Sequence, residues 1–372
     1  MKKTALRWAC VASMCLLCAS AAFAAEKTKA WRNVDARELR IINRGWPDGT
    51  HTYRRLPDFL QDSIRPTLAD RALCSSGIAV RFATNSSRVG VRYRLLKNFH
   101  MNHMADTGTK GVDLYIFEGD SVWRHVNTIR PAADKETKII NGRLAANLDT
   151  TRMAEYMLYL PLYDGVEEFE VKVDSLADIS AGNPELIDSK RRIVAYGTSI
   201  MQGGCASRPG MASSNIISRE LNAEVINLGF SGEGKMDFCL ARAMAAIPGV
   251  DMFILDPVPN CTEDMCDSLT YDFVNIIRKA CPGVPIVMVE GPIYPYARYD
   301  SYWGKYLPAK NAAYRRNYEK LKAENPDNLY YVTSVCLDGP EDDGTVDGIH
   351  LTDLGFRHYA NKLVPLIRDI LK

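Results

Sequence analysis

The stretch 191-RRIVAYGTSIM-201 decides the fold of the second half of this 372-residue chain. A run of apolar residues stops abruptly at Gly197, and Thr198 and Ser199 follow. An apolar run without polar alternation indicates a strand that is buried on both faces of a parallel sheet. The sequence therefore predicts a buried strand whose carboxyl end carries either an ordinary turn serine or a nucleophile.

Four further apolar runs follow, and stretches with a helical pattern separate them. The runs are 223-AEVINL-228, 251-DMFILD-256, 285-PIVMVE-290 and 329-LYYVT-333. The alternation of strand and helix predicts a doubly wound α/β layer over residues 186–372.

The first half of the chain has a different pattern. Short runs between residues 39 and 179 alternate apolar with polar residues and are rich in β-branched and aromatic side chains, as in 77-GIAVRFAT-84 and 167-EEFEVKV-173. Turn clusters separate these runs, and no long helical pattern interrupts them. This arrangement favours a β-sandwich or jelly roll, which we predict for residues 30–182.

The N-terminus is typical of an export signal. Residues 1–24 combine a basic start, a short apolar stretch and a small-residue ending at Ala24. A lipoprotein anchored through Cys15 or Cys18 is the alternative, although neither cysteine follows the small residue usual at such processing sites. No later apolar run approaches the roughly 18 residues that a membrane span needs. We therefore expect an exported protein, periplasmic or secreted, without a membrane span.

Charge and cysteine content narrow the class of protein further. The formal net charge is +1 and the basic residues are dispersed, so the sequence does not indicate a nucleic-acid partner. Outside the predicted signal, seven cysteines remain, an odd number that leaves at least one thiol unpaired within a single chain. Cys261 and Cys266 are close enough to pair, and separate free thiols are the alternative.

Polar residues and glycines follow the predicted strands of the α/β layer. Ser199 follows the first strand, Gly232 lies in a glycine-rich turn after the second, and Asn260 follows the third. Asp347 and His350 precede the last predicted helix. Because ligands of open parallel sheets bind outside the carboxyl ends of the strands, we expect these residues to meet.

Together these residues fit nucleophilic catalysis. A serine hydroxyl needs a base, and His350 is the candidate because an imidazole titrates near neutrality. Asp347 would orient that imidazole, and the N–H groups of Ser199 and Gly232 with the Asn260 amide would hold an oxyanion. Taken singly, each is more often a helix cap, a surface histidine or a turn residue. Their joint occurrence at successive strand ends favours a catalytic site.

The motifs "YGTSI", "NLGFSG", "PN" and "DGIH" resemble the four blocks of the SGNH hydrolase (GDSL-type esterase) superfamily. The usual Gly-Asp-Ser is here Gly197-Thr198-Ser199, and the usual Gly-x-Asn-Asp is reduced to Pro259-Asn260. The stretch 111-GVDLYIF-117 is similar to the signature of a bacterial subfamily in which a Gly-x-Asp-Leu-Tyr β-sandwich precedes the catalytic domain.

The resemblance implies a flavodoxin-like sheet and an exported serine esterase that removes short acyl groups, in the first place acetyl, from oligosaccharides or polysaccharides. It implies no metal or organic cofactor. A lipase or thioesterase acting on longer acyl chains is one alternative, and a noncatalytic carbohydrate-binding protein is another. The glycan and the oligomeric state are not set by the sequence.

Three further stretches are weaker candidates for sites. His100 and His103 form an H-x-x-H pattern that suggests either a metal or a loop packed at the mouth of the active site. An acidic, glycine-rich loop with Asp338, Asp342 and Asp343 resembles a calcium loop but lacks the spacing of an EF-hand. The aromatic stretch 293–303 either stacks on a substrate or packs a long loop.

Overall fold

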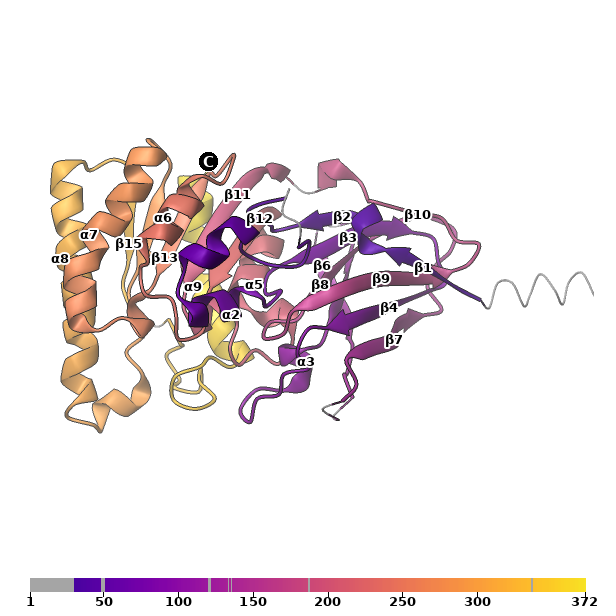
Figure 1. Ribbon diagram of the computed structural model, residues 1–372, viewed down its shortest axis with the longest axis horizontal. Helices are drawn as coiled ribbons and strands as arrows, with labels where there is room; N and C mark the ends of the chain where they lie inside the picture. The colour runs from indigo at the N-terminus through magenta and orange to yellow at the C-terminus, as the bar shows by residue number, and fades with distance from the viewer. Residues whose placement is uncertain are drawn as a thin grey trace, which may run out of the picture.

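The computed structural model describes residues 30–47, 51–119, 122–132, 134, 136–186, 188–335 and 337–372, with the side chains of 188–190 excepted. The predicted signal peptide, residues 1–24, and Cys336 lie outside the described residues. The molecule is elongated, with an all-β layer at one end and a helix-rich layer at the other (Figure 1).

The all-β layer is a sandwich of two antiparallel sheets, as predicted. One sheet has the order β1 (Trp31–Asp35), β9 (Val166–Asp174), β4 (Arg88–Leu95), β7 (Ile139–Ala146). The other has the order β10 (Ile179–Ser180), β3 (Ala79–Thr84), β8 (Ala154–Tyr159), β5 (Asp113–Phe117), β6 (Trp123–Thr128), and β2 (Arg40–Ile42) also pairs with β3. Alternate side chains of both sheets pack between them, for example Val91, Phe82 and Leu158.

The helix-rich layer contains a parallel sheet of five strands. Its order is β12 (Ala223–Gly229), β11 (Asp188–Gly197), β13 (Met252–Asp256), β14 (Ile286–Val289), β15 (Leu329–Val332). In order of appearance this is 2-1-3-4-5, the flavodoxin-like arrangement. The predicted doubly wound sheet is confirmed, and each predicted apolar run forms one strand because both faces of the sheet are covered.

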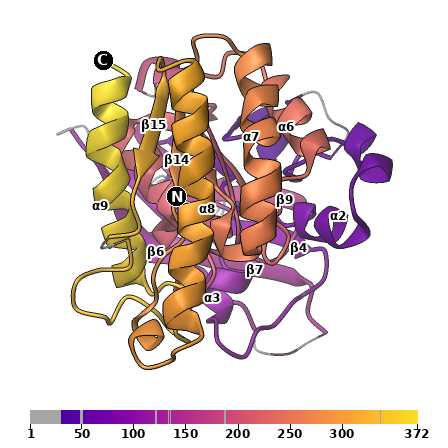
Figure 2. The same cartoon turned by 90° about the vertical axis from the view of Figure 1, so that its left-hand side faces the viewer.

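Helices cover the two faces of the parallel sheet. α4 (Ser199–Gln202), α5 (Ser213–Leu221) and α9 (Asp353–Ile370) pack on one face. α6 (Phe238–Ala245), α7 (Glu263–Ala280) and most of α8 (Trp303–Glu324) pack on the other. Figure 2 shows β14 and β15 between α9 and α8. Threonine caps start α7 and α9: the Thr262 hydroxyl accepts from the Met265 N–H, and that of Thr352 from the Gly355 N–H.

Short helices occupy the connections. They are η1 (Ala36–Glu38), η2 (Asp58–Ser63), α2 (Pro66–Ala72), α3 (Asp106–Thr109), η3 (Pro184–Leu186), η4 (Pro209–Met211), η5 (Val258–Asn260) and η6 (Pro295–Arg298). Among the helices of the described residues, none is long and apolar enough to cross a bilayer.

The segment that contains η2 and α2 packs against the α/β layer. Leu56, Leu60, Leu68 and Ala72 belong to the same core cluster as Phe230 and the residues of α6 and α7. The sequence placed this segment with the sandwich, because two helices of six and seven residues carry too short a pattern to be recognised. The domain ranges 30–182 and 186–372 therefore stay a prediction, with this segment shared between the layers.

The described cysteines are Cys74, Cys205, Cys239, Cys261, Cys266 and Cys281, and all six are free thiols. The pairing of Cys261 with Cys266, which the sequence left open, is thus not formed.

Candidate active site

Ser199 lies at the junction of a buried strand and a helix. β11 ends at Gly197, and the side chain of Thr198 accepts a hydrogen bond from the N–H of Ile200 at 3.3 Å, which caps α4. Ser199 is the first residue of α4, where a backbone N–H has no acceptor within the helix. The residue is 6% exposed and lines a cavity.

A chain of hydrogen bonds joins Ser199 to the loop that precedes α9. The Nε2 atom of His350 lies 3.0 Å from the Ser199 Oγ. On the other side of the ring, Nδ1 lies 2.8 Å from the Oδ2 of Asp347. Since an Asp at Nδ1 fixes the tautomer in which Nε2 can accept a proton, the three predicted residues have the geometry of a nucleophile, its base and an orienting acid.

The carboxylate of Asp347 is held in its ionised form. Burial by itself would raise its pKa, but the His350 ring and the backbone N–H groups of His350 and Ile349 donate hydrogen bonds to it. The net result is a pKa below the ordinary value for an aspartate. Asp347 therefore remains a negative charge beside the imidazole down to acidic pH.

The predicted oxyanion donors line the same cavity as Ser199. Gly232, in the loop after β12, has φ +74°, a conformation that favours glycine. Asn260 ends η5, and its Oδ1 accepts a hydrogen bond from the Gly234 N–H at 3.2 Å. That contact leaves the Nδ2 end of the amide as the available donor.

Gln202 connects this loop to the sandwich. Its Oε1 accepts from the N–H of Ser231 at 2.9 Å, and its Nε2 donates to the carbonyl of Leu162 at 3.0 Å. Leu162 follows β8 of the sandwich, so one buried side chain fixes the Gly232 loop against both layers.

The cavity beside Ser199 has a volume of about 370 Å³. Lys310 of α8 is its buried cation: Nζ donates to the Pro259 carbonyl at 3.3 Å and lies 5.6 Å from the ring centroid of Tyr306. Burial lowers the pKa of Lys310. The other lining residues are Ser231, Gly232, Val258, Pro259, Asn260, Gly291, Pro292, Tyr294, Tyr296, Trp303, Leu307, Asn311, Ile349 and His350.

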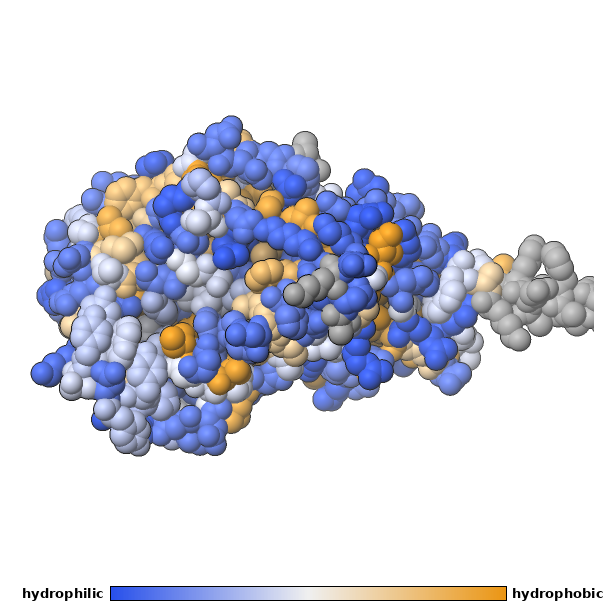
Figure 3. Space-filling view, turned by 60° about the horizontal axis from the view of Figure 1, so that its bottom comes forward, coloured by the Kyte–Doolittle hydropathy of each residue, from blue (hydrophilic) through white to orange (hydrophobic). Residues whose placement is uncertain are grey.

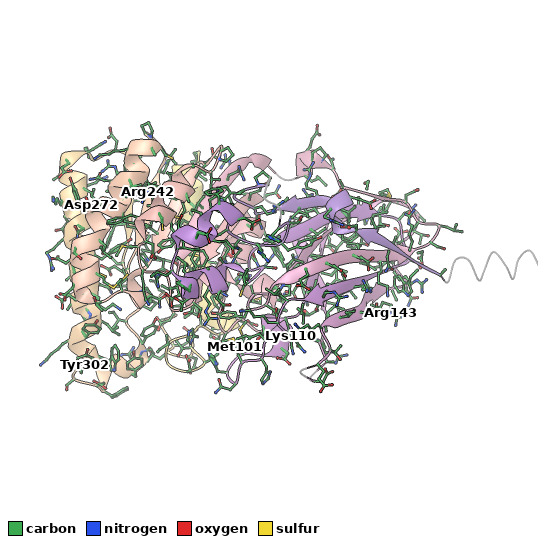
Figure 4. All side chains as sticks on the ribbon, in the orientation of Figure 1. Met101, Lys110, Arg143, Arg242, Asp272 and Tyr302 are labelled. Atoms are coloured by element: carbon green, nitrogen blue, oxygen red, sulfur yellow. The ribbon has the colours of Figure 1, made fainter. Side chains whose placement is uncertain are left out.

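Aromatic rings continue from the cavity onto the surface. Tyr294 stacks on Tyr296 at 5.8 Å between centroids, and Tyr296 contacts Trp303 edge-on at 5.9 Å. Trp303 then contacts Tyr302, which is 60% exposed. Figure 3 shows ring-shaped side chains gathered at one end of this face, and Figure 4 places Tyr302 at the end of α8. The predicted aromatic stretch thus packs part of its loop and exposes Tyr302 at the surface, and its stacking on a substrate stays a prediction.

The sandwich also reaches the site, through the loop between β4 and α3. Met104 is buried in the α/β core, and Met101 packs against it (Figure 4). The ring of His103 lies 5.4 Å from that of His350, centroid to centroid. The loop therefore packs at the mouth of the site, as one interpretation of the H-x-x-H pattern expected, while His100 is turned away from His103 to Asp106 at 2.9 Å.

The Gly-x-Asp-Leu-Tyr signature holds the loop that follows α4. The fully buried Asp113 accepts hydrogen bonds from Arg208 at 2.8 Å and from the Gly210 N–H at 2.7 Å. The hydroxyl of Tyr115 accepts from Arg208 at 2.7 Å, and the Tyr115 ring lies so close to Gly210 that a Cβ there would be 2.2 Å from that hydroxyl. The sequence does not indicate the contact of Arg208 with Asp113 and Tyr115, because these residues are far apart along the chain.

A buried acid lies at the end of β13. Asp256 is fully buried, its Oδ2 accepts a hydrogen bond from the Tyr359 hydroxyl at 2.8 Å, and its Oδ1 has no partner among the described residues. Burial raises its pKa to about 8. The sequence does not distinguish a protonated aspartate at a strand end from an ionised one.

The acidic loop does not gather its carboxylates. Asp342 pairs with Arg298 at 2.5 Å, and the neighbouring Glu341 contacts His358 at 2.7 Å. Among the described residues, the acids at 338, 342 and 343 form no group of candidate metal ligands.

The fold is that of an SGNH hydrolase, a class of esterases. The chain belongs to the GDSL-like lipase/acylhydrolase family, which residues 190–368 match. Residues 29–179 match the GxDLY domain, the N-terminus of SGNH hydrolase-type esterases. No curated protein matches the chain.

Solved structures share both layers of the protein. A GDSL-like lipase from Bacteroides ovatus ATCC 8483 is 33% identical, with 92% of this chain and 98% of that chain covered and a TM-score of 0.85. The salicylyl-acyltransferase SsfX3 from a tetracycline biosynthetic pathway is 18% identical, with 92% and 99% covered and a TM-score of 0.71. A family two carbohydrate esterase from Cellvibrio japonicus is 14% identical, with 92% and 98% covered and a TM-score of 0.55.

Proposed function

We propose that the protein is an exported serine esterase that removes acetyl groups from oligosaccharides or polysaccharides. The observation that carries the proposal is the chain of hydrogen bonds from Ser199 through His350 to Asp347, which opens into a cavity of about 370 Å³. A volume near the lower end of the ~300–1,000 Å³ usual for ligand pockets suits a short acyl group on part of a sugar.

The reaction follows from the positions of these groups. The Ser199 Oγ attacks the ester carbonyl carbon while its proton passes to the Nε2 of His350, and Asp347 stabilises the imidazolium. The oxyanion would be held by the N–H groups of Ser199 and Gly232 and by the Nδ2 of Asn260. The sugar alcohol leaves with the proton from Nε2. Water then attacks the acyl-enzyme by the same proton route and releases acetate.

The surface aromatic rings support a carbohydrate substrate. Tyr296 and Trp303 line the cavity, and Tyr302 and the 88% exposed Tyr299 lie beyond it. Exposed rings have apolar faces and polar edges, which suit the C–H faces and hydroxyl edges of a sugar ring. The fold itself is shared with a protein named as a carbohydrate esterase and with one named as an acyltransferase, so the fold does not choose the acyl acceptor.

A panel of acetylated glycans, scored by acetate release, tests the proposal. We expect acetate release from at least one glycan, p-nitrophenyl acetate to be cleaved faster than the octanoate, and EDTA to leave the rate unchanged. Activity should fall at acidic pH, because protonation of the His350 imidazole removes the base that accepts the Ser199 proton. A preference for octanoate would move the assignment to a lipase or thioesterase.

The carbohydrate part of the proposal has its own control. Tyr302→Ala should weaken kcat/KM on an acetylated oligosaccharide and leave p-nitrophenyl acetate unaffected, since the small ester does not reach the surface rings. If the parent and Tyr302→Ala had equal rates on every glycan, the exposed rings would not belong to the substrate site. Binding of glycans without any ester cleavage would favour a noncatalytic binding protein.

The signal peptide predicted at residues 1–24 supports export. Expression of the whole chain in a bacterium should give a mature protein that begins near Ala25 and is recovered outside the cytoplasm, as N-terminal sequencing would show. Lipid attached at Cys15 or Cys18 would support the lipoprotein alternative.

A further inference from the structure

Three side chains of the types that bind zinc meet beside Ser199. They are His103 from the sandwich, Cys205 from the loop after α4, and His350. One ligand atom of each lies within 4.8 Å of the other two. Cys205 is 6% exposed, so packing fixes the position of its sulfur.

We propose that these three side chains form a zinc site, and that zinc bound there blocks the esterase. Imidazole nitrogen and thiolate sulfur are preferred ligands of zinc, and three protein ligands leave a fourth position for water or for the Ser199 hydroxyl. Tetrahedral metal–nitrogen and metal–sulfur bonds of about 2.0–2.3 Å place ligand atoms roughly 3.3–3.8 Å apart, so the three groups would close by up to about 1–1.5 Å from the 4.8 Å limit when zinc binds.

Hydrogen bonds already orient both imidazoles for this role. The Nδ1 of His350 is held by Asp347 at 2.8 Å, and the Nδ1 of His103 lies 3.0 Å from the Oδ1 of Asn102. Each ring therefore has Nε2 as its remaining nitrogen. A carboxylate that holds Nδ1 while Nε2 binds metal is the usual support of a zinc-bound histidine. The hydrogen bond between Asp347 and His350 thus orients the imidazole equally for binding zinc and for accepting a proton from the serine.

Inhibition follows from competition for one nitrogen. The Nε2 of His350 lies 3.0 Å from the Ser199 Oγ, and a bound zinc ion would occupy the lone pair that takes the serine proton. The Cys205 thiol releases its proton to solvent when the sulfur–zinc bond forms, and nothing is oxidised or reduced. Removing the metal with a chelator returns both groups to their starting state.

Zinc binding does not depend on the proposed esterase function. Only the proposed inhibition rests on that function. The two parts need separate measurements: calorimetric titration of zinc into the metal-free protein, and esterase rate against free zinc concentration. The whole mature chain is used for both, because His103 comes from the sandwich and the other ligands from the α/β layer.

Calorimetry should show one equivalent of zinc bound by the parent protein. Cys205→Ala and His103→Gln should each lower the affinity at least about tenfold, which corresponds to ~1.4 kcal/mol. Cys239→Ala, which removes a thiol on α6, is the matched control and should bind like the parent. Magnesium should not bind, because it prefers oxygen ligands. Cobalt should give a thiolate-to-metal charge-transfer band that Cys205→Ala lacks.

In the rate assay, zinc should inhibit the parent, and EDTA should restore the full rate. Cys205→Ala should keep the uninhibited turnover and need at least about ten times more zinc for half-inhibition. Equal zinc affinity of parent and Cys205→Ala, or no one-equivalent binding, would overturn the zinc site. If the protein is an active esterase whose rate does not change with zinc, only the proposed inhibition is wrong. Zinc binding by a protein that cleaves no ester would leave the site standing and reject the proposed function.

Discussion

The two layers of the molecule differ in what they give to the site. The α/β layer carries every residue that we propose to react, from Ser199 to His350, and each lies at a strand end or in the loop before α9. The sandwich carries none of them, yet Asp113, Tyr115 and Met104 hold the loops on which those residues depend. The comparison teaches that the chemistry is local to one layer while its geometry is shared by both.

The largest effect should come from the reacting layer. Ser199→Ala should lower kcat/KM by about 10⁴ or more, because the members of such a site act as a unit. The Tm should stay close to that of the parent, since the Ser199 hydroxyl contacts His350 in the cavity and packs no core. Ester hydrolysis with p-nitrophenyl acetate and a thermal melt measure the two effects. Ser268→Ala, an exposed serine on α7, is the control, and a parental rate for Ser199→Ala would disprove the mechanism.

Removing the sandwich altogether tests whether the geometry is shared. Residues 186–372 expressed alone should be insoluble or poorly active, because Leu56, Leu68 and Met104 are missing from the two faces of the α/β core. Solubility, circular dichroism and esterase rate are compared with those of the mature chain prepared in parallel. A soluble fragment with full activity on a glycan would mean that the sandwich does not shape the site.

A single substitution in the sandwich should have a smaller effect of the same kind. Asp113→Asn weakens the bond to Arg208 and should destabilise the protein by ~1–3 kcal/mol, the cost of losing a buried hydrogen bond to a charged group. We expect kcat/KM to fall about tenfold, equivalent to ~1.4 kcal/mol, as the 205–211 loop loosens. Urea unfolding and ester hydrolysis measure the two effects.

The matched control lies on the outer part of the sandwich. Arg92 and Glu170 form a half-exposed pair at 3.0 Å, and such pairs contribute ~0–1 kcal/mol. Glu170→Gln should therefore leave stability and turnover nearly unchanged. If Asp113→Asn behaved like Glu170→Gln, the signature would not support the site.

The smallest effect concerns pH and the buried acid of the α/β layer. Asp256 has a pKa of about 8 when folded, whereas an unfolded aspartate titrates near 3.9. Between these values the unfolded chain binds fewer protons than the folded one, so stability falls as pH rises from about 4 to 8 and then levels off. Asp256→Asn removes this slope and should raise Tm by a few degrees at pH 8, with less change at pH 5.

Thermal melts across that pH range measure the effect of Asp256→Asn. Asp272→Asn, an exposed change on α7, is the control and should keep the parental slope (Figure 4). A parental slope for Asp256→Asn would show that its carboxyl group is ionised in the folded protein.

The sequence predicted the features that depend on residue patterns within short segments. The apolar runs became β11 to β15 because burial on both faces leaves no polar positions, and the alternating runs became the sandwich. Ser199, Asp347 and His350 could be found because strand ends of a parallel sheet converge, and the structure brings the three together. Their catalytic roles stay predictions, as do those of Gly232 and Asn260.

What the sequence did not predict depends on contacts between distant segments. The partnership of Asp113 with Arg208 joins the two layers, and no local pattern marks it. The segment 56–72 gave no helical period because its helices are short. The raised pKa of Asp256 arises from burial under α9, which only the packed structure defines.

The segment 56–72 also affects how the chain reaches its fold. Leu56 and Leu68 are synthesised early, but the core against which they pack, which includes Phe230 and Val274, is synthesised much later. Contacts so distant along the chain slow folding, since the entropy of closing a long loop is lost before the contact forms. These apolar side chains therefore have no core to pack against until synthesis is nearly complete. Refolding of the denatured protein should accordingly be slow, and its exposed leucines should make it prone to aggregate before the two layers close together.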